Sequence, residues 1–176
     1  MILREATPAD KAAVLEVHAL AFGQDEESLL VDALLADPSA QPLLSLLAED
    51  GGSVVGHVLF TKAELVGPDT PPAASILAPL AVVPSAQGSG VGRQLIEQGC
   101  KLLAQRGVGL VFVLGDPDYY TKRGFIAAVP HGLHAQYEIH PENAWMVRSL
   151  DGVALSSYRG KVNCADALAP EKYWRE

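Results

Sequence analysis

Residues that could bind a phosphate group gather in one short segment of the sequence. Between Gln87 and Arg93, glycines occupy positions 88, 90 and 92. Because glycine has no side chain, several backbone N–H groups there could approach one ligand closely. The segment follows an apolar run and precedes an amphipathic one, so it predicts a helix start whose first N–H groups lack helical partners. Such a start favours a phosphate or diphosphate, with Arg93 as a nearby cation.

The glycine pattern also leaves alternatives open. A tight turn between a strand and a helix needs one glycine, so three of them favour a ligand site. A methyltransferase-type Gly-x-Gly-x-Gly fits the spacing, and a dinucleotide-binding unit would place an acid such as Asp116 about 20 residues further on. Three features oppose a dinucleotide: Arg93 replaces the third glycine of that pattern, residues 84–87 separate the strand from the glycines, and repeated strand–helix units are missing after Asp116.

The elements that must position this segment alternate along the chain. Apolar periodicity and turn residues predict two opening helices, a hairpin and then a strand–helix–strand unit. The predicted helices begin at Pro8, at Gln24 or Asp25, at Val91 (to Arg106) and after the N-cap Asp116 (to Gly124). The predicted strands cover residues 43–48, 54–61, 75–83, 108–114, 125–129 and 144–150. This order predicts an α/β fold with a mixed sheet and one parallel pair of strands.

Several details of these elements are predicted as well. Gly23 ends the first helix, and residues 66–72 form a loop because proline and glycine prevent regular pairing. Pro79 cannot donate a hydrogen bond within its strand, which predicts a bulge or lost pairing there. The predicted apolar faces are Ala13, Val17, Leu20 and Ala21 in the first helix, and Leu29, Leu30, Ala33 and Leu34 in the second.

Two motifs together resemble the GCN5-related N-acetyltransferase (GNAT) superfamily. Residues 87–92, Gln-Gly-Ser-Gly-Val-Gly, fit the family signature Gln/Arg-x-x-Gly-x-Gly/Ala, and residues 120–125 fit its Tyr-x-x-x-Gly-Phe. Residues 114–120, Leu-Gly-Asp-Pro-Asp-Tyr-Tyr, are similar to a segment of a bacterial predicted-acetyltransferase branch. With the opening helices and the hairpin, the resemblance covers roughly residues 1–130.

This resemblance implies a GNAT-like mixed, splayed β-sheet flanked by helices and acetyl-coenzyme A as the acetyl donor. The diphosphate of the donor would lie on the amides of residues 87–92. Its pantetheine arm would lie where the strand ending at Val83 splays from the strand starting at Val108, against the main chain near Leu80 and Val82. The donor-binding residues expected on this basis are Leu80, Val82, Gln87, Gly88, Ser89, Gly90, Val91, Gly92 and Arg93.

The family chemistry is the direct attack of an amine on the thioester, and Tyr120 is the expected general acid. A phenol with a pKa near ~10 protonates a thiolate with a pKa near ~8.5 at a cost of about 2 kcal/mol. A positioned general acid contributes roughly 10²–10⁴ in rate. Tyr119 and Tyr120 lie about 100° apart on a helix, so both cannot line one cleft. The motif selects Tyr120, and core packing of both tyrosines is the alternative.

The residue that takes the proton of the amine is left unassigned. An alkylamine with a pKa of ~10.4 is only about one part in 2,500 neutral at pH 7. Many GNAT relatives carry a carboxylate on the strand before the glycines, but residues 75–83 contain none. Glu64, His57 and Asp116 are possible bases, but each has a simpler interpretation: Glu64 as a solvated strand end, His57 as a strand residue and Asp116 as a helix cap. The acceptor is therefore an unidentified small-molecule or peptide amine, unless a weakly basic amine or a hydroxyl removes the need for a base.

Composition limits the class of protein. Its length of 176 residues indicates one domain, with a core over 1–130 and further strands and a tail over 131–176. Its net charge of −8 disfavours nucleic acid as a partner. It lacks both the ~18 apolar residues of a membrane span and a leader sequence, so we expect a cytoplasmic protein that does not bind membranes. A non-catalytic acyl-CoA-binding module is the remaining alternative to an enzyme.

Residues 131–176 and the cysteines carry weaker signals. His131, His134 and His140 lack a nearby cysteine or paired carboxylate, so no metal site is expected. Cys100 is predicted to be a small buried side chain, and Cys164 has no evident partner. The aromatic residues of this part are expected to pack over the sheet, although they could also wall an acceptor pocket or form a homodimer contact: Tyr137, Trp145, Tyr158, Tyr173 and Trp174.

Overall fold

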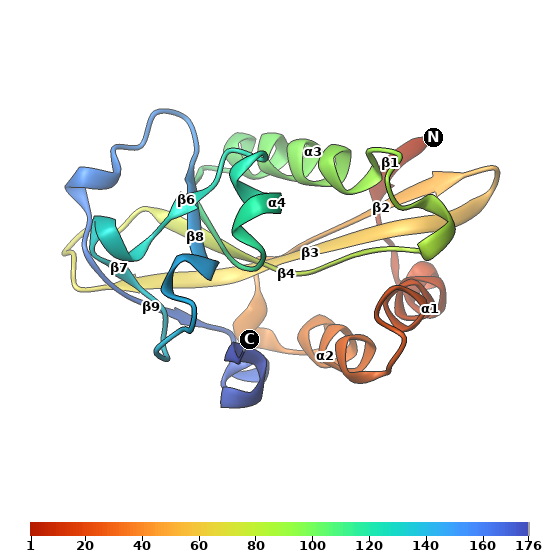
Figure 1. Ribbon diagram of the computed structural model, residues 1–176, viewed down its shortest axis with the longest axis horizontal. Helices are drawn as coiled ribbons and strands as arrows, with labels where there is room; N and C mark the ends of the chain where they lie inside the picture. Colours follow the sequence, from red (N-terminus) through yellow and green to blue (C-terminus); the bar gives the residue numbers. More distant parts are fainter. Residues whose placement is uncertain (176) are drawn as a thin grey trace.

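A mixed sheet organises residues 1–175, which are the residues that the computed structural model describes (Figure 1). Its nine strands are β1 (Ile2–Glu5), β2 (Leu44–Asp50), β3 (Ser53–Val66), β4 (Ala73–Val82), β5 (Val108–Leu114), β6 (Ile126–Ala127), β7 (Leu133–His134), β8 (Trp145–Ser149) and β9 (Gly160–Cys164). The α-helices are α1 (Lys11–Phe22), α2 (Glu26–Leu35), α3 (Val91–Gln105) and α4 (Pro117–Thr121). Short 3₁₀ turns include η2 (Pro38–Ala40), η4 (Val129–His131), η7 (Asp166–Leu168) and η8 (Glu171–Trp174).

The strands pair in the order β1-β2-β3-β4-β5-β8-β6, and β9 pairs with both β3 and β7. Helices α3 and α4 cover one face of the sheet, whereas α1 and α2 lie on the other (Figure 1). Each face has its own apolar core: Phe60, Leu95 and Ile96 pack on the α3 side, and Leu34 and Phe112 on the α2 side. The predicted mixed α/β fold is confirmed.

The sheet opens between β4 and β5. Their parallel pairing ends at Leu77 and Val113, whereas β4 continues to Val82 along β3. The β3–β4 register shifts between Val58 and Phe60, opposite residues 78–79. The bulge predicted at Pro79 is therefore confirmed, because proline has no N–H for the ladder. Strands β4 and β5 thus form a fork: beyond Leu77 and Val113, the backbone edges that face each other do not pair.

The helix boundaries were predicted well, and the buried faces of the first two helices were predicted in part, since Val17, Leu30 and Leu34 are buried as expected. Gly23 ends α1 in the left-handed conformation, as expected. The buried side chains of α1 are Val14, Val17 and His18, and those of α2 are Leu30, Val31 and Leu34. Leu20 is 52% exposed and Leu29 is 65% exposed. The prediction was wrong there because both helices are largely apolar all round, so packing rather than periodicity selects the buried face.

The sheet is also larger than predicted. Strand β3 extends to Val66, into the predicted loop, because β9 pairs with its last four residues. Strands β1, β7 and β9 were missed, and β7 with β9 adds a second parallel pair. The predicted strand over residues 125–129 shrinks to β6, because η4 begins at Val129. Among residues 1–175, no helix combines the length and apolarity needed to cross a bilayer.

Candidate functional site

The glycine segment lines a cavity of about 670 Å³ between the start of α3 and α4, here called the loop cavity. All nine residues predicted to bind the donor line it. Ala86, Tyr119 and Arg123 complete the lining and were missed. Arg123 could have been found from its place in the Tyr-x-x-x-Gly-Phe motif, since it is a cation one helical turn beyond Tyr119.

The backbone of this segment requires its glycines. Gly88 and Gly90 have φ of +79° and +87°, which other residues adopt only with strain. A Cβ on Gly92 would lie 2.5 Å from the hydroxyl oxygen of Tyr119, so a side chain there would force the Tyr119 ring to move. Among residues 1–175, no backbone hydrogen bond outside the regular elements uses the amides of Gly88 to Gly90. These N–H groups remain available to an anion.

Two side chains stabilise the loop cavity. Gln87 donates from Nε2 to the carbonyl of Val82 over 3.0 Å, so it holds the loop against the end of β4. Arg123 stacks over the ring of Tyr119, with its guanidinium carbon 4.3 Å from the ring centroid. The Nε of Arg123 is buried and makes no hydrogen bond within the described part of the chain. A cation is thus fixed at the wall opposite the glycines.

A second cavity, of about 510 Å³, lies at the fork of β4 and β5 and is here called the fork cavity. Leu80 lines both cavities, so they are neighbours at β4. Its lining comes from α1 and α2, from the two forked strands with Tyr120, and from the C-terminal segment. The residues are Phe22, Glu26, Glu27, Leu30, Ile76, Leu77, Ala78, Pro79, Leu80, Val113, Leu114, Tyr120, Leu168, Lys172, Tyr173, Trp174 and Arg175.

Tyr119 and Tyr120 point into different cavities, as their helical spacing predicts. Asp116 caps α4 by accepting from the amide of Asp118, also as predicted. Tyr120 is 9% exposed and packs edge-on against Phe125. Burial, with a smaller contribution from Tyr119, raises the pKa of the Tyr120 phenol above its usual value. The hydroxyl therefore stays protonated near neutral pH, and it gives up its proton less readily than a free phenol would.

The residues weighed as a general base lie elsewhere. Glu64 is exposed and pairs with Lys62 over 2.9 Å. The ring of His57 is fully buried, with Nδ1 2.8 Å from Nε2 of His18 and Nε2 2.8 Å from Oγ of Ser45. Burial, and then the charge of His18, lowers the pKa of His57 to about 3. Neither these two residues nor Asp116 lines the fork cavity.

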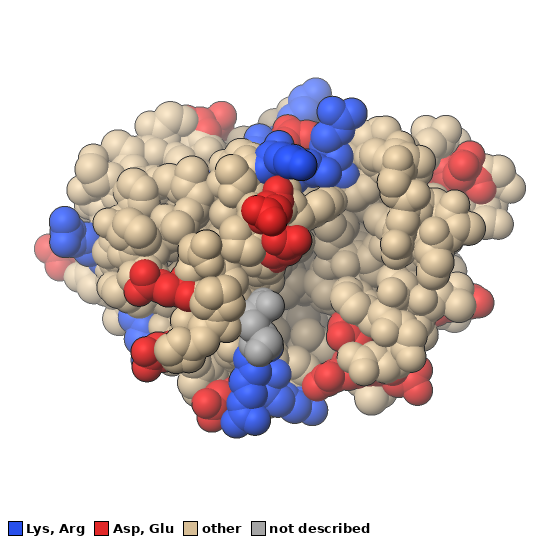
Figure 2. All heavy atoms as spheres, in the orientation of Figure 1, with Lys and Arg blue, Asp and Glu red and all other residues tan. Residues whose placement is uncertain are grey.

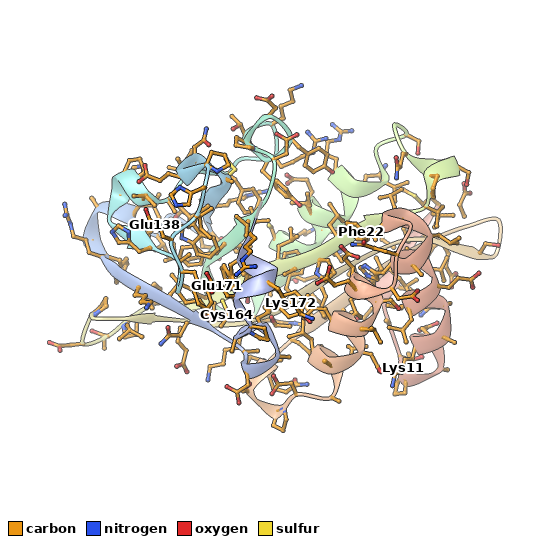
Figure 3. The ribbon with its side chains drawn as sticks, turned by 60° about the horizontal axis from the view of Figure 1, so that its bottom comes forward. Lys11, Phe22, Glu138, Cys164, Glu171 and Lys172 are labelled. Carbon is orange, nitrogen blue, oxygen red and sulfur yellow. The ribbon has the colours of Figure 1, made fainter. Side chains whose placement is uncertain are left out.

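The polar groups that do line the fork cavity were not predicted. Glu26 and Glu27 begin α2, Lys172 belongs to η8, and Arg175 directly follows η8. In Figure 2, acidic side chains gather over α2 and basic ones over the C-terminal segment, with a hollow between. Figure 3 shows Lys172 and Phe22 on different walls of the cavity that both residues line. The sequence offered no signal, because the two walls lie more than a hundred residues apart.

The C-terminal aromatic residues have two roles. Trp145 is fully buried and stacks on Phe112 with ring centroids 5.2 Å apart, as the packing prediction requires. Tyr173 and Trp174 also line the fork cavity, as the pocket alternative requires. Cys100 is buried as predicted, and burial raises the pKa of its thiol to about 11.

Comparison with known proteins decides between the families that the glycine pattern allowed. Residues 3–128 match the model of a family described as "Acetyltransferase (GNAT) domain". This chain belongs to the GNAT family. It is an acetyltransferase, so the methyltransferase, dinucleotide and non-catalytic alternatives do not hold.

Individual GNAT proteins are similar to this chain over most of its length. An uncharacterised N-acetyltransferase of Escherichia coli K12, YjhQ, is 44% identical over 161 residues, which is 90% of this chain and 88% of YjhQ. The crystal structure of the GNAT protein YhbS from E. coli, in complex with CoA, has a TM-score of 0.86 and 31% identity, and the match covers 96% of this chain and 92% of YhbS. A GNAT acetyltransferase of Brucella melitensis, in complex with acetyl-CoA, has a TM-score of 0.74 and 29% identity, with 94% and 96% covered.

Proposed function

We propose that this protein transfers the acetyl group of acetyl-CoA to an amine by direct attack on the thioester. The observation that supports this most is that one residue, Leu80, lines two neighbouring cavities. One contains the glycine loop and the other contains Tyr120. The CoA and acetyl-CoA complexes of the GNAT relatives supply the ligand class.

The diphosphate of the donor would lie in the loop cavity, on the amides of residues 88–92. These amides point out of a strand-to-helix turn and carry the partial positive charge of the start of α3. Arg93 and Arg123 add full charges to the same cavity. The net charge of −8 does not prevent binding, because distant surface charges are screened over about 8 Å.

The pantetheine arm would pass along the inner edge of β4 between the two cavities. Beyond Leu77, β4 has no partner on the β5 side, so backbone groups near Leu80 and Val82 can bond the amides of the arm. The carbonyl of Val82 already accepts from Gln87, and a carbonyl oxygen has a second lone pair to offer. This path would bring the thioester into the fork cavity beside Tyr120.

In the fork cavity, the amine nitrogen forms a bond to the thioester carbon and a tetrahedral oxyanion results. The C–S bond then breaks, the electron pair leaves on sulfur, and the proton of Tyr120 moves to the thiolate. Glu26 and Glu27 are the carboxylates of this cavity within the described chain, so they would take the proton of the attacking amine through water. This assignment supplies the base that the sequence left open.

Calorimetry with acetyl-CoA tests the donor, and release of the CoA thiol in the presence of amines tests the reaction. We expect saturable binding of one acetyl-CoA per chain and amine-dependent thiol release with a matching N-acetylated product. Absence of acetyl-CoA binding would contradict the proposal. Thiol release that is equal with and without any amine would reduce the activity to hydrolysis.

A further inference from the structure

The two outer walls of the fork cavity carry opposite charges. Glu26 and Glu27 come from the first turn of α2, and Glu27 is held by Gln24, which donates from Nε2 to Oε1 over 3.1 Å. Lys172 comes from η8, where its ammonium lies 5.0 Å from the centroid of the Tyr173 ring. A ligand between these walls therefore meets an acidic and a basic side.

The basic wall is fixed in place rather than loosely attached. The amide of Ala167 donates to Oδ2 of Asp37 over 2.9 Å, which ties η7 to η2 below α2. The indole N–H of Trp174 donates to the carbonyl of Leu168 over 2.7 Å, and the Trp174 side chain is buried. One long-range hydrogen bond and one hydrogen bond within the C-terminal segment thus hold η7 and η8, which carries Lys172, in place.

The space between the walls is small and its floor is apolar. Leu30, Leu77, Val113 and Leu168 are all buried and line the cavity. The volume of about 510 Å³ must also admit the acetyl end of the donor. A folded protein domain cannot enter such a space, whereas a molecule with one short apolar side chain can.

From this arrangement we infer that the acceptor is a small amine that also carries an acidic group, such as an amino acid with an apolar side chain. The inference rests on the proposed acetyl transfer and names its substrate class. The ammonium is attracted by the carboxylates of α2, the acidic group pairs with Lys172, and the side chain covers the apolar floor. A simple amine would leave Lys172 without an acidic partner, and a polyamine would place a second positive charge against the basic wall, so both should bind less well.

The test compares leucine and phenylalanine with leucinamide and phenylalaninamide as acceptors. Each pair keeps the amine and the side chain but replaces the carboxylate with a neutral amide. The ratio of kcat/KM for acid over amide is measured in the wild type and in Lys172→Gln. Comparing the two ratios cancels the different basicity of the two amines. We expect Lys172→Gln to lower the ratio about fivefold, as suits a solvent-exposed ion pair.

Two further variants make the result specific. Lys101→Gln removes the same charge from the exposed face of α3, away from the cavity, and leaves the ratio unchanged. Glu27→Gln lowers kcat/KM for acid and amide alike, because both carry the amine that this carboxylate attracts and deprotonates.

Several outcomes would overturn the inference. An equal acid-to-amide ratio in wild type and Lys172→Gln overturns it, and so does acetylation of spermidine while both amino acids are inert. Bound acetyl-CoA with no acetylation of any of the four acceptors overturns the inference and leaves donor binding intact. Failure to bind acetyl-CoA at all instead removes the proposed function, and the inference falls with it.

Discussion

The loop cavity and the fork cavity are built in different ways. Eight of the twelve residues that line the loop cavity are consecutive, from Ala86 to Arg93. The fork cavity takes its lining from the ends of α1 and α2, from β4 and β5, and from a C-terminal segment over a hundred residues away. A site built from one turn is determined by the few residues of that turn. A site built from several helices and strands exists only after those elements have packed together.

This difference matches the division of labour in the proposed reaction. The donor side needs backbone amides and a fixed turn, which a short motif supplies. The acceptor side needs shape and charge from facing walls, and one wall lies beyond residue 128, where the match to the GNAT family model ends. Changes in the two cavities should therefore affect different kinetic constants.

The largest expected effect separates the two neighbouring tyrosines. Tyr120→Phe should lower kcat by about 10²–10⁴ and leave the Kd of acetyl-CoA unchanged, because it removes the proton donor from the fork cavity. Tyr119→Phe, in the loop cavity, should change the Kd for acetyl-CoA more than kcat. Steady-state kinetics and calorimetry measure both constants. If the two variants change the same constant to the same extent, the cavities do not have separate roles.

A matched pair of glycines tests the donor side alone. Gly88 and Gly107 have φ of +79° and +86°, and a Cβ on either meets no atom within 4 Å. Valine at either position therefore costs a similar backbone strain, about 1–2 kcal/mol. Gly88→Val should weaken acetyl-CoA binding about tenfold or more, because its side chain enters the loop cavity, whereas Gly107→Val should not. Equal losses would mean that strain alone, not the site, controls affinity.

The acceptor-side helices should also loosen in mild acid, through the buried pair of His18 and His57. Burial lowers the pKa of His18 to about 4, and burial followed by the charge of His18 lowers that of His57 to about 3. Both rings are neutral in the folded protein, so the unfolded chain binds more protons below its pKa of ~6.5. The stability they give is complete above about pH 6.5 and is lost as the pH falls toward 4, by about 2 kcal/mol per histidine at pH 5.

Urea unfolding between pH 7 and pH 5 measures this loss, and amide hydrogen exchange locates it. We expect α1 to exchange earlier than α3 as the pH falls, because His18 joins α1 to the sheet. His57→Gln should flatten the pH dependence, while His134→Gln, at an exposed position, should leave it unchanged. Simultaneous exchange of α1 and α3 would show that both faces open together.

The smallest expected effect concerns the attachment of the C-terminal wall. Oδ1 of Asp37 accepts from the amide of Ser39, and Oδ2 accepts from that of Ala167. The hydrogen bond that the Ser39 hydroxyl donates to Oδ1, followed by the bond from the Ala167 amide, lowers the pKa of Asp37, so the carboxylate stays charged at neutral pH. Asp37→Asn can keep the first bond but turns an NH₂ toward Ala167, which should cost up to about 1 kcal/mol. KM for the acceptor should rise a few-fold with the Kd of acetyl-CoA unchanged, whereas Asp69→Asn should change neither.

Much of the fold could be predicted because its signals are local. The two-sided apolar runs gave β4 and β5, the amphipathic period gave α3, and the cap residues gave α4. The same local logic assigned the glycine loop and separated Tyr119 from Tyr120. It failed for the faces of α1 and α2, whose apolar residues lie on all sides, and for β9, whose five residues become a strand only by pairing with β3.

By itself, the sequence determined the turn that exposes the amides of residues 88–92, the break at Pro79 and the helix that carries Tyr120. Each depends on steric and hydrogen-bonding limits within a few neighbouring residues. Only the tertiary structure decided which carboxylates and which lysine line the fork cavity together with Tyr120. Those groups come together because apolar surfaces far apart in the chain are buried against each other, and no local residue pattern encodes contacts between such distant segments.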